Sequence, residues 1–165
     1  MVSRGRVVIA AAFGALGLGF LGYYYYANLD IPELEKVQLD LVAVRVLEVN
    51  SIDKRANLEI DFLVTNSGKK TATISTINYE LFANGKDIGN GEYSTEDIAL
   101  PGRALIYPGQ SVTLTGAFNL VYTDRVADEY FAITNGEQIS YMARGSLTVE
   151  SAWATVDKQF ESAFS

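Results

Sequence analysis

The sequence contains no cysteine, no histidine and only 3 prolines among its 165 residues. Without cysteine, disulfides, thiolate zinc sites and iron–sulfur clusters are excluded. Without histidine, the chain lacks the commonest general base and the commonest metal ligand. We therefore expect a protein that is not an enzyme, with no catalytic, cofactor-binding or metal-binding residues and no cofactor.

The charges are unevenly distributed along the chain, whose formal net charge is −7. Arg4 and Arg6 precede an apolar segment, whereas every acidic residue follows it. Subtracting the two arginines leaves 11 basic and 20 acidic residues, a net charge of −9, in the remainder. Such an acidic domain repels phosphate backbones, so nucleic acid is not an expected partner. No motif identifies a small-molecule substrate.

The N-terminal segment Val7–Gly22 is uncharged and apolar, and four tyrosines follow it directly. As a helix, Val7–Tyr26 would rise about 30 Å, the thickness of a hydrocarbon core. We therefore predict a cytoplasmic stub and transmembrane signal-anchor helix in residues 1–27, with membrane lipid as a partner. The predicted membrane-interface residues are Arg4, Arg6, Tyr23, Tyr24, Tyr25 and Tyr26. The alternative is a cleaved signal peptide, against which the bulky tyrosines argue.

This orientation would keep the N-terminus in the cytoplasm and place residues 36–165 outside it, at the cell membrane. Residues 28–35 are polar, contain Pro32 and are predicted to form a linker. Ala11, Ala15 and Gly19 form a small-xxx-small series that predicts packing against another helix. Protein partners could therefore bind through this helix or through an edge of the exported domain.

Beyond the linker the hydrophobic period is mostly two, as in Leu58–Val64, which predicts strands. Asn84-Gly85 indicates a hairpin whose two turn residues have positive φ. Pro108-Gly109 indicates a type II turn. A short helix is predicted at Arg125–Thr134, capped by Asp124 and ended by Gly136. About seven short strands and one small helix predict a mainly β protein, an immunoglobulin-like or fibronectin-like antiparallel sandwich preceded by the transmembrane helix.

The order of these segments resembles the water-stress-and-hypersensitive-response (WHy) domain of the group-two late-embryogenesis-abundant (LEA) proteins. Over residues 37–155 the chain has the segments FLVTNSG, TISTINYELFANGKDIGNG and ISYMARGSLTV in the order of that domain. Asn66-Ser67 departs from it, since the family often has Asn-Pro there. The matching positions are Asn66, Ile77, Tyr79, Leu81, Gly85, Ile88, Gly89, Gly91, Ile139, Tyr141 and Gly145.

The resemblance implies a sandwich without catalysis, linked to desiccation and stress tolerance, and members with a membrane anchor. We therefore expect a membrane-tethered stress-protection or protein-interaction module. The alternative is a structural subunit of a membrane complex or of a pilus-like surface filament. Outside the motif, Trp153 is expected to pack in the core or at a sheet end. Phe160 and Phe164 are spaced as on one face of a helical turn.

Overall fold

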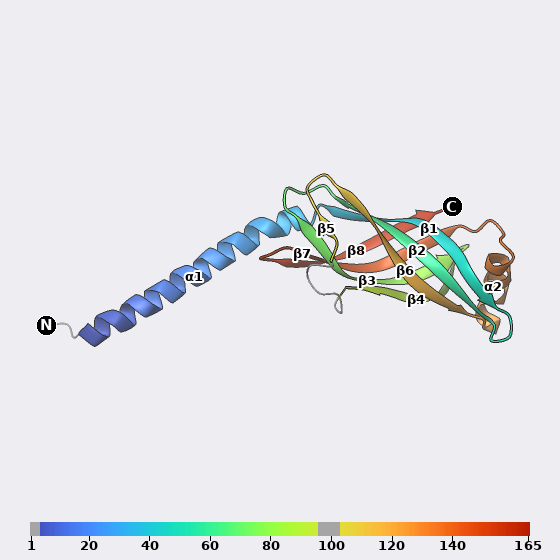
Figure 1. Ribbon diagram of the computed structural model, residues 1–165, viewed down its shortest axis with the longest axis horizontal. Coiled ribbons are helices and arrows are strands. Elements are labelled where there is room, and N and C mark those ends of the chain that lie inside the picture. Colours follow the sequence, from blue (N-terminus) through green and yellow to red (C-terminus); the bar gives the residue numbers. More distant parts are fainter. Residues whose placement is uncertain (1–3, 96–102) are drawn as a thin grey trace.

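The structure is a computed structural model that describes residues 4–95 and 103–165, with side chains from residue 15 onward except residue 27. Its β part consists of two antiparallel sheets (Figure 1). The first has the order β1-β2-β6, formed by Val37–Asn50, Arg55–Asn66 and Ser111–Val121. The second has the order β4-β3-β7-β8, formed by Lys86–Ser94, Ala72–Ala83, Tyr141–Glu150 and Thr155–Phe164. The short strand β5, Leu105–Ile106, pairs with the start of β3.

The core lies between the two sheets, as the period-two alternation predicts. Leu58, Ile60 and Phe62 of β2 are buried, as are Ile77, Tyr79 and Leu81 of β3. The rings of Phe62 and Tyr79 meet edge to face with centroids 5.0 Å apart. The mainly β, antiparallel arrangement therefore agrees with the sequence prediction.

The turns that the sequence marks are present. Asn84 and Gly85, between β3 and β4, have φ values of 50° and 84°. At Pro108-Gly109 the amide of Gln110 donates to the carbonyl of Tyr107 at 3.0 Å, and Gly109 has a φ of 76°. Glycine tolerates these positive φ values without a steric penalty. Both turn predictions are confirmed.

The short helix begins differently from the prediction. A 3-10 turn, η2 (Asp124–Val126), leads into the helix α2 (Ala127–Thr134). Asp124 lies inside that first turn, and neither segment has a side-chain cap, so the predicted capping role is wrong. Gly136 follows the helix with a φ of 73°, as expected of a residue that ends it.

The first and last strands of the β part meet at a seam between the two sheets. Lys158, on the inward side of β8, donates to the backbone carbonyls of Glu35 and Val37. The amide of Leu41 on β1 donates to Ser162 Oγ at 2.9 Å. Burial lowers the pKa of Lys158, and nearby Glu35 partly offsets this shift. Side chains of β8 thus bond backbone groups along the edge of β1.

The N-terminal helix α1 runs from Arg4 to Leu34 and projects from the β part (Figure 1). Among the residues that the structure describes, no helix is both long and apolar enough to cross a membrane. The predicted transmembrane signal-anchor, and with it the single-pass cell-membrane location, is therefore wrong.

The predicted linker is also wrong, because residues 28–34 continue the helix and dock on the β part. Leu34 is fully buried, and Asp30 is 2% exposed. Asp30 Oδ2 accepts a hydrogen bond from Ser151 Oγ at 2.8 Å, and Oδ1 lies 3.2 Å from Lys70 Nζ. A polar segment that looked like a spacer therefore holds the last turns of α1 against the domain.

The C-terminal aromatic residues lie on a strand, not on a helical turn. Phe160 faces inward from β8, and its ring centroid is 6.0 Å from that of Phe62. Pairing of β8 with β7, from Tyr141↔Phe164 to Glu150↔Thr155, overrides the local helical spacing. Phe164 lies at the end of that strand and is 36% exposed.

Candidate functional site

A recessed area on the outer face of the β4-β3-β7-β8 sheet is the best candidate site. It has a volume of ≈ 1040 Å³ and is open to solvent. We call it the trench, because it runs across all four strands between two rows of polar side chains. One row follows the register Asn90, Glu80, Arg144 and Glu161. The other follows Glu92, Asn78, Ser146 and Gln159.

The floor of the trench is the register row Gly91, Tyr79, Gly145 and Phe160. Tyr79 and Phe160 direct their side chains to the opposite side, into the core. A Cβ atom on Gly145 would clash with the backbone carbonyl oxygen of Asn78 and lie 2.8 Å from Tyr79 Cα. The missing side chain at Gly145 therefore permits the close approach of β7 to β3.

Tyr79 fills the space that Gly91 leaves open on the core side. A Cβ on Gly91 would lie 2.6 Å from Cε2 of the Tyr79 ring. The Tyr79 hydroxyl is buried and makes no hydrogen bond with any described residue. Burial raises the pKa of Tyr79 to about 12, so this hydroxyl stays protonated at neutral pH. The two family-motif glycines and the motif tyrosine thus form one packing unit beneath the trench.

The charges of the trench are partly compensated at its centre and uncompensated at its ends. Arg144 forms an ion pair with Glu80 at 2.9 Å and lies 4.7 Å from the centroid of the Phe82 ring. Glu92, on β4, and Glu161, on β8, are exposed. Neither forms an ion pair with any residue that the structure describes. Both ends of the trench therefore carry an available negative charge.

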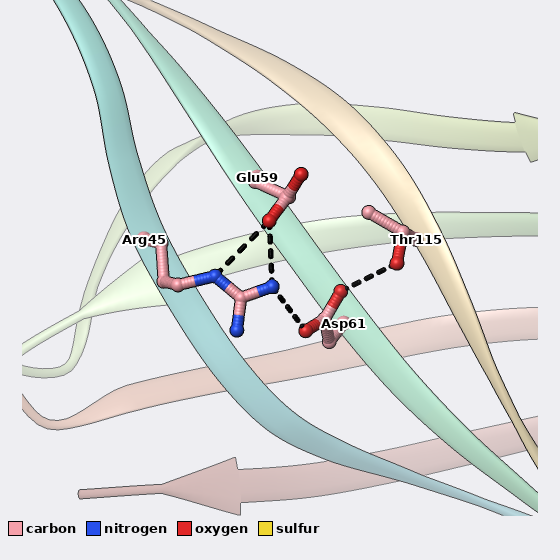
Figure 2. A network of polar contacts seen from close by, with 4 residues as sticks. All are labelled: Arg45, Glu59, Asp61 and Thr115. Atoms are coloured by element: carbon pink, nitrogen blue, oxygen red, sulfur yellow. Dashed lines mark hydrogen bonds and ion pairs between the residues drawn. The ribbon is translucent and has the colours of Figure 1, made fainter.

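The outer face of the other sheet carries a closed polar network (Figure 2). Arg45 Nη2 lies 2.6 Å from Glu59 Oε1 and 2.6 Å from Asp61 Oδ2. Thr115 Oγ1 donates to the second oxygen of Asp61 at 2.7 Å. Hydrogen bonding to Glu59 and the charge of Asp61 raise the pKa of Arg45 above its ordinary value. These groups bond one another across three strands and leave little capacity for a ligand.

Asn66, the first residue of the family motif, has a structural role. Its side chain is fully buried and donates from Nδ2 to the carbonyls of Lys70 and Ile106 at 2.7 and 2.8 Å. Its Oδ1 accepts from the amide of Gly68 at 2.9 Å. These three bonds hold the loop that follows β2. The other apolar motif residues, Ile77, Leu81, Ile88, Ile139 and Tyr141, are buried.

The remaining motif glycines lie in or near the β3–β4 hairpin. Gly85 occupies the turn, and Gly89 has a φ of 138° beside the Phe118 ring. The likeness to the WHy domain therefore falls on core and turn positions. None of these side chains lines the walls of the trench.

The four predicted interface tyrosines lie next to one another on α1, and each is more than half exposed. Tyr23 and Tyr26 of α1 pack against Trp153, with centroids 6.5 and 6.2 Å away. Trp153 lies between β7 and β8 and is 50% exposed, so it packs at a sheet end. Tyr24 and Tyr25 are exposed. The side chains of Arg4 and Arg6 lie outside the described ones.

The small residues of α1 lie beside a shallow apolar hollow. Ala15 and Gly19 line it together with Leu16, Phe20 and Tyr23. Ala11 lies outside the described side chains. No other described residue lines this hollow, and the predicted packing against another helix stays a prediction.

The described residues contain no group of three or more acidic side chains gathered as for a metal ion. Two serines that could be considered as nucleophiles have structural partners: Ser111 Oγ lies 2.8 Å from Thr65 Oγ1, and Ser151 Oγ donates to Asp30 Oδ2 at 2.8 Å. Sequence reasoning missed the trench, although Glu80, Glu92 and Glu161 all stand at polar positions of alternating strands. The signal that could have found it is the pair Gly91 and Gly145, which meet on either side of Tyr79.

No family model and no curated protein matches the sequence. In fold, the chain is similar to an Arabidopsis thaliana protein known from a solution structure, with 15% identity and a TM-score of 0.50, over 77% of this chain and 83% of that one. It is also similar to a candidate LEA protein, with 13% identity, a TM-score of 0.46, and 98% and 90% of the two chains covered. A protein from Archaeoglobus fulgidus has 19% identity and a TM-score of 0.42, over 76% of this chain and 96% of that one.

These comparisons concern the fold alone, because the identities are low. The structural neighbours include a candidate LEA protein. No finding tests the WHy assignment itself.

Proposed function

We propose that this protein is a non-catalytic interaction module of the WHy type, which binds other proteins and protects them when water is scarce. The observation that carries the proposal is the trench, a hollow of ≈ 1040 Å³ on the outside of a hydrogen-bonded sheet. Binding sites supported by a rigid scaffold lose little entropy when a partner docks. The four paired strands and the glycine floor provide such a scaffold here.

The side chains of the trench favour binding over chemistry. Amides, a serine hydroxyl, carboxylates and one guanidinium line its walls, and these groups donate and accept hydrogen bonds. General acid–base catalysis would instead need a group with a pKa near the working pH. The nearest buried hydroxyl, that of Tyr79, has a pKa of about 12 and faces the core. We therefore assign the trench a binding role.

The proposal is tested by drying a sensitive enzyme, lactate dehydrogenase, with an equimolar amount of the full-length protein and assaying it after rehydration. We expect more residual activity than with an equal mass of serum albumin. A mixture that recovers no more activity than the albumin control would contradict the protective role.

A second measurement addresses catalysis directly. The purified protein is incubated with panels of ester, peptide and glycoside substrates. We expect no turnover above buffer. Turnover that falls when Glu92 and Glu161 are replaced by glutamine would show that the trench is an active site, and the proposal would be wrong.

A further inference from the structure

We infer that the trench binds an extended peptide segment with two basic side chains four residues apart, an inference that rests on the proposed interaction function. The two available carboxylates, Glu92 and Glu161, lie on the two edge strands of the sheet. Glu80, between them, is already paired with Arg144. The attraction for a cationic ligand is therefore strongest at the two ends of the trench.

The spacing of the two ends fits such a segment. Three inter-strand steps of about 4.8 Å place β4 and β8 about 14 Å apart. In an extended peptide, residues i and i+4 lie on the same face and are separated by about 13 Å. The two register rows lie two residues apart along the strands, an offset of about 7 Å that brings the separation of the two carboxylate positions to about 16 Å. Lysine and arginine have long, flexible side chains that can cover the extra distance.

The polar side chains of the trench walls favour a basic peptide over other cationic ligands. Asn78, Asn90 and Gln159 each offer both a donor and an acceptor, which matches the N–H and C=O groups of a peptide backbone. A linear polyamine has no carbonyl acceptor for the amide N–H groups. The volume of ≈ 1040 Å³ lies at the upper end of the range for small-ligand pockets and leaves room for a short peptide segment. An anionic polymer would be repelled by the two end carboxylates.

The test uses the full chain, labelled with ¹⁵N and titrated by NMR with the synthetic peptide Lys-Thr-Thr-Thr-Lys, blocked at both ends. We expect amide shifts along the strand segments that line the trench. We expect the control peptide Lys-Thr-Lys-Thr-Thr, with the same charge but a shorter spacing, to bind roughly 3- to 5-fold more weakly, since an exposed ion pair contributes this much. A higher salt concentration should weaken both peptides.

The matched variants separate site-specific binding from general charge attraction. Glu92→Gln with Glu161→Gln should weaken the peptide roughly tenfold, because both end contacts are lost. Glu48→Gln with Glu137→Gln removes the same charge from exposed glutamates elsewhere and should change the affinity less than about twofold. Thermal unfolding of all variants should match the wild type.

The inference is overturned if the two double variants weaken the peptide equally, if neither peptide binds, or if spermine binds as tightly as Lys-Thr-Thr-Thr-Lys. The drying assay then separates the two proposals. If protection persists although no peptide binds the trench, the interaction function stands and this partner class is wrong. If peptide binding behaves as expected but protection is absent, the inference stands as binding and the protective function is wrong.

Discussion

The outer faces of the two sheets carry the same kinds of residue in opposite arrangements. On the β1-β2-β6 face, Arg45 contacts two carboxylates, and Thr115 donates to one of them (Figure 2). On the β4-β3-β7-β8 face, one arginine contacts one carboxylate, and Glu92 and Glu161 are left over. Polar groups that bond one another stabilise a fold, whereas polar groups left in solvent remain available to a partner. The difference indicates which face is structural and which is free to bind.

The largest expected effect comes from comparing one glycine of each sheet, Gly145 on β7 and Gly116 on β6. Gly145→Ala would press a methyl group against the backbone of β3, so we expect a loss of about 3 kcal/mol in the free energy of unfolding. The control is Gly116→Ala on β6, where a new Cβ would meet nothing closer than Tyr93 Cβ at 3.9 Å. Urea denaturation measures both, and equal losses would contradict the close approach of β7 to β3.

The next effect compares one carboxylate from each face. Asp61 is 7% exposed, and Asp61→Ala would leave Thr115 and Arg45 without this partner, at a cost of about 2–3 kcal/mol. Glu80→Ala removes an ion pair exposed on both sides and should cost less than about 1 kcal/mol. Chemical denaturation of the two variants gives the comparison. A costlier Glu80→Ala would invert the roles assigned to the two faces.

The smallest effect at neutral pH concerns the inner face. Tyr79→Phe removes a hydroxyl that has no partner among the described residues, so stability at pH 7 should change by less than about 1 kcal/mol. The folded-state pKa of Tyr79 is about 12, above its ordinary value of 10. Below pH 10 both states are protonated. Between pH 10 and 12 the unfolded state loses its proton first, and stability falls.

This loss amounts to about 1.4 kcal/mol per pH unit. Burial also raises the pKa values of Tyr93 and Tyr141, so the measured quantity is the difference between wild type and Tyr79→Phe. Between pH 9 and pH 11 the free energy of unfolding of the wild type should fall by about 1.4 kcal/mol relative to that of the variant, which lacks this titration. Parallel pH profiles would show that the Tyr79 hydroxyl reaches solvent or a partner.

The features that the sequence predicted correctly depend on neighbours in the chain. Asn84-Gly85 requires positive φ at two consecutive residues, and few residue pairs accept it. The alternation in Leu58–Val64 fixes which face of β2 is buried. These local rules were sufficient for the antiparallel strands and their turns.

The features that it did not predict depend on distant pairing. Phe160 and Phe164 suit a helical turn when read alone, but β7 supplies a partner strand that the spacing does not reveal. Asp30 looked like part of a polar linker because its partners, Lys70 and Ser151, come from loops far along the chain. The trench could not be predicted because its residues come together only through the register of four strands.

The seam between β1 and β8 bears on how fast the protein folds. The bonds from Lys158 to Val37 and from Leu41 to Ser162 each join residues 121 positions apart. Closing so long a loop costs entropy before any contact compensates for it. Proteins dominated by such distant contacts fold in milliseconds to seconds, far more slowly than helical bundles. During synthesis, the edge of β1 that bonds β8 therefore stays without these hydrogen bonds until nearly the whole domain has emerged from the ribosome.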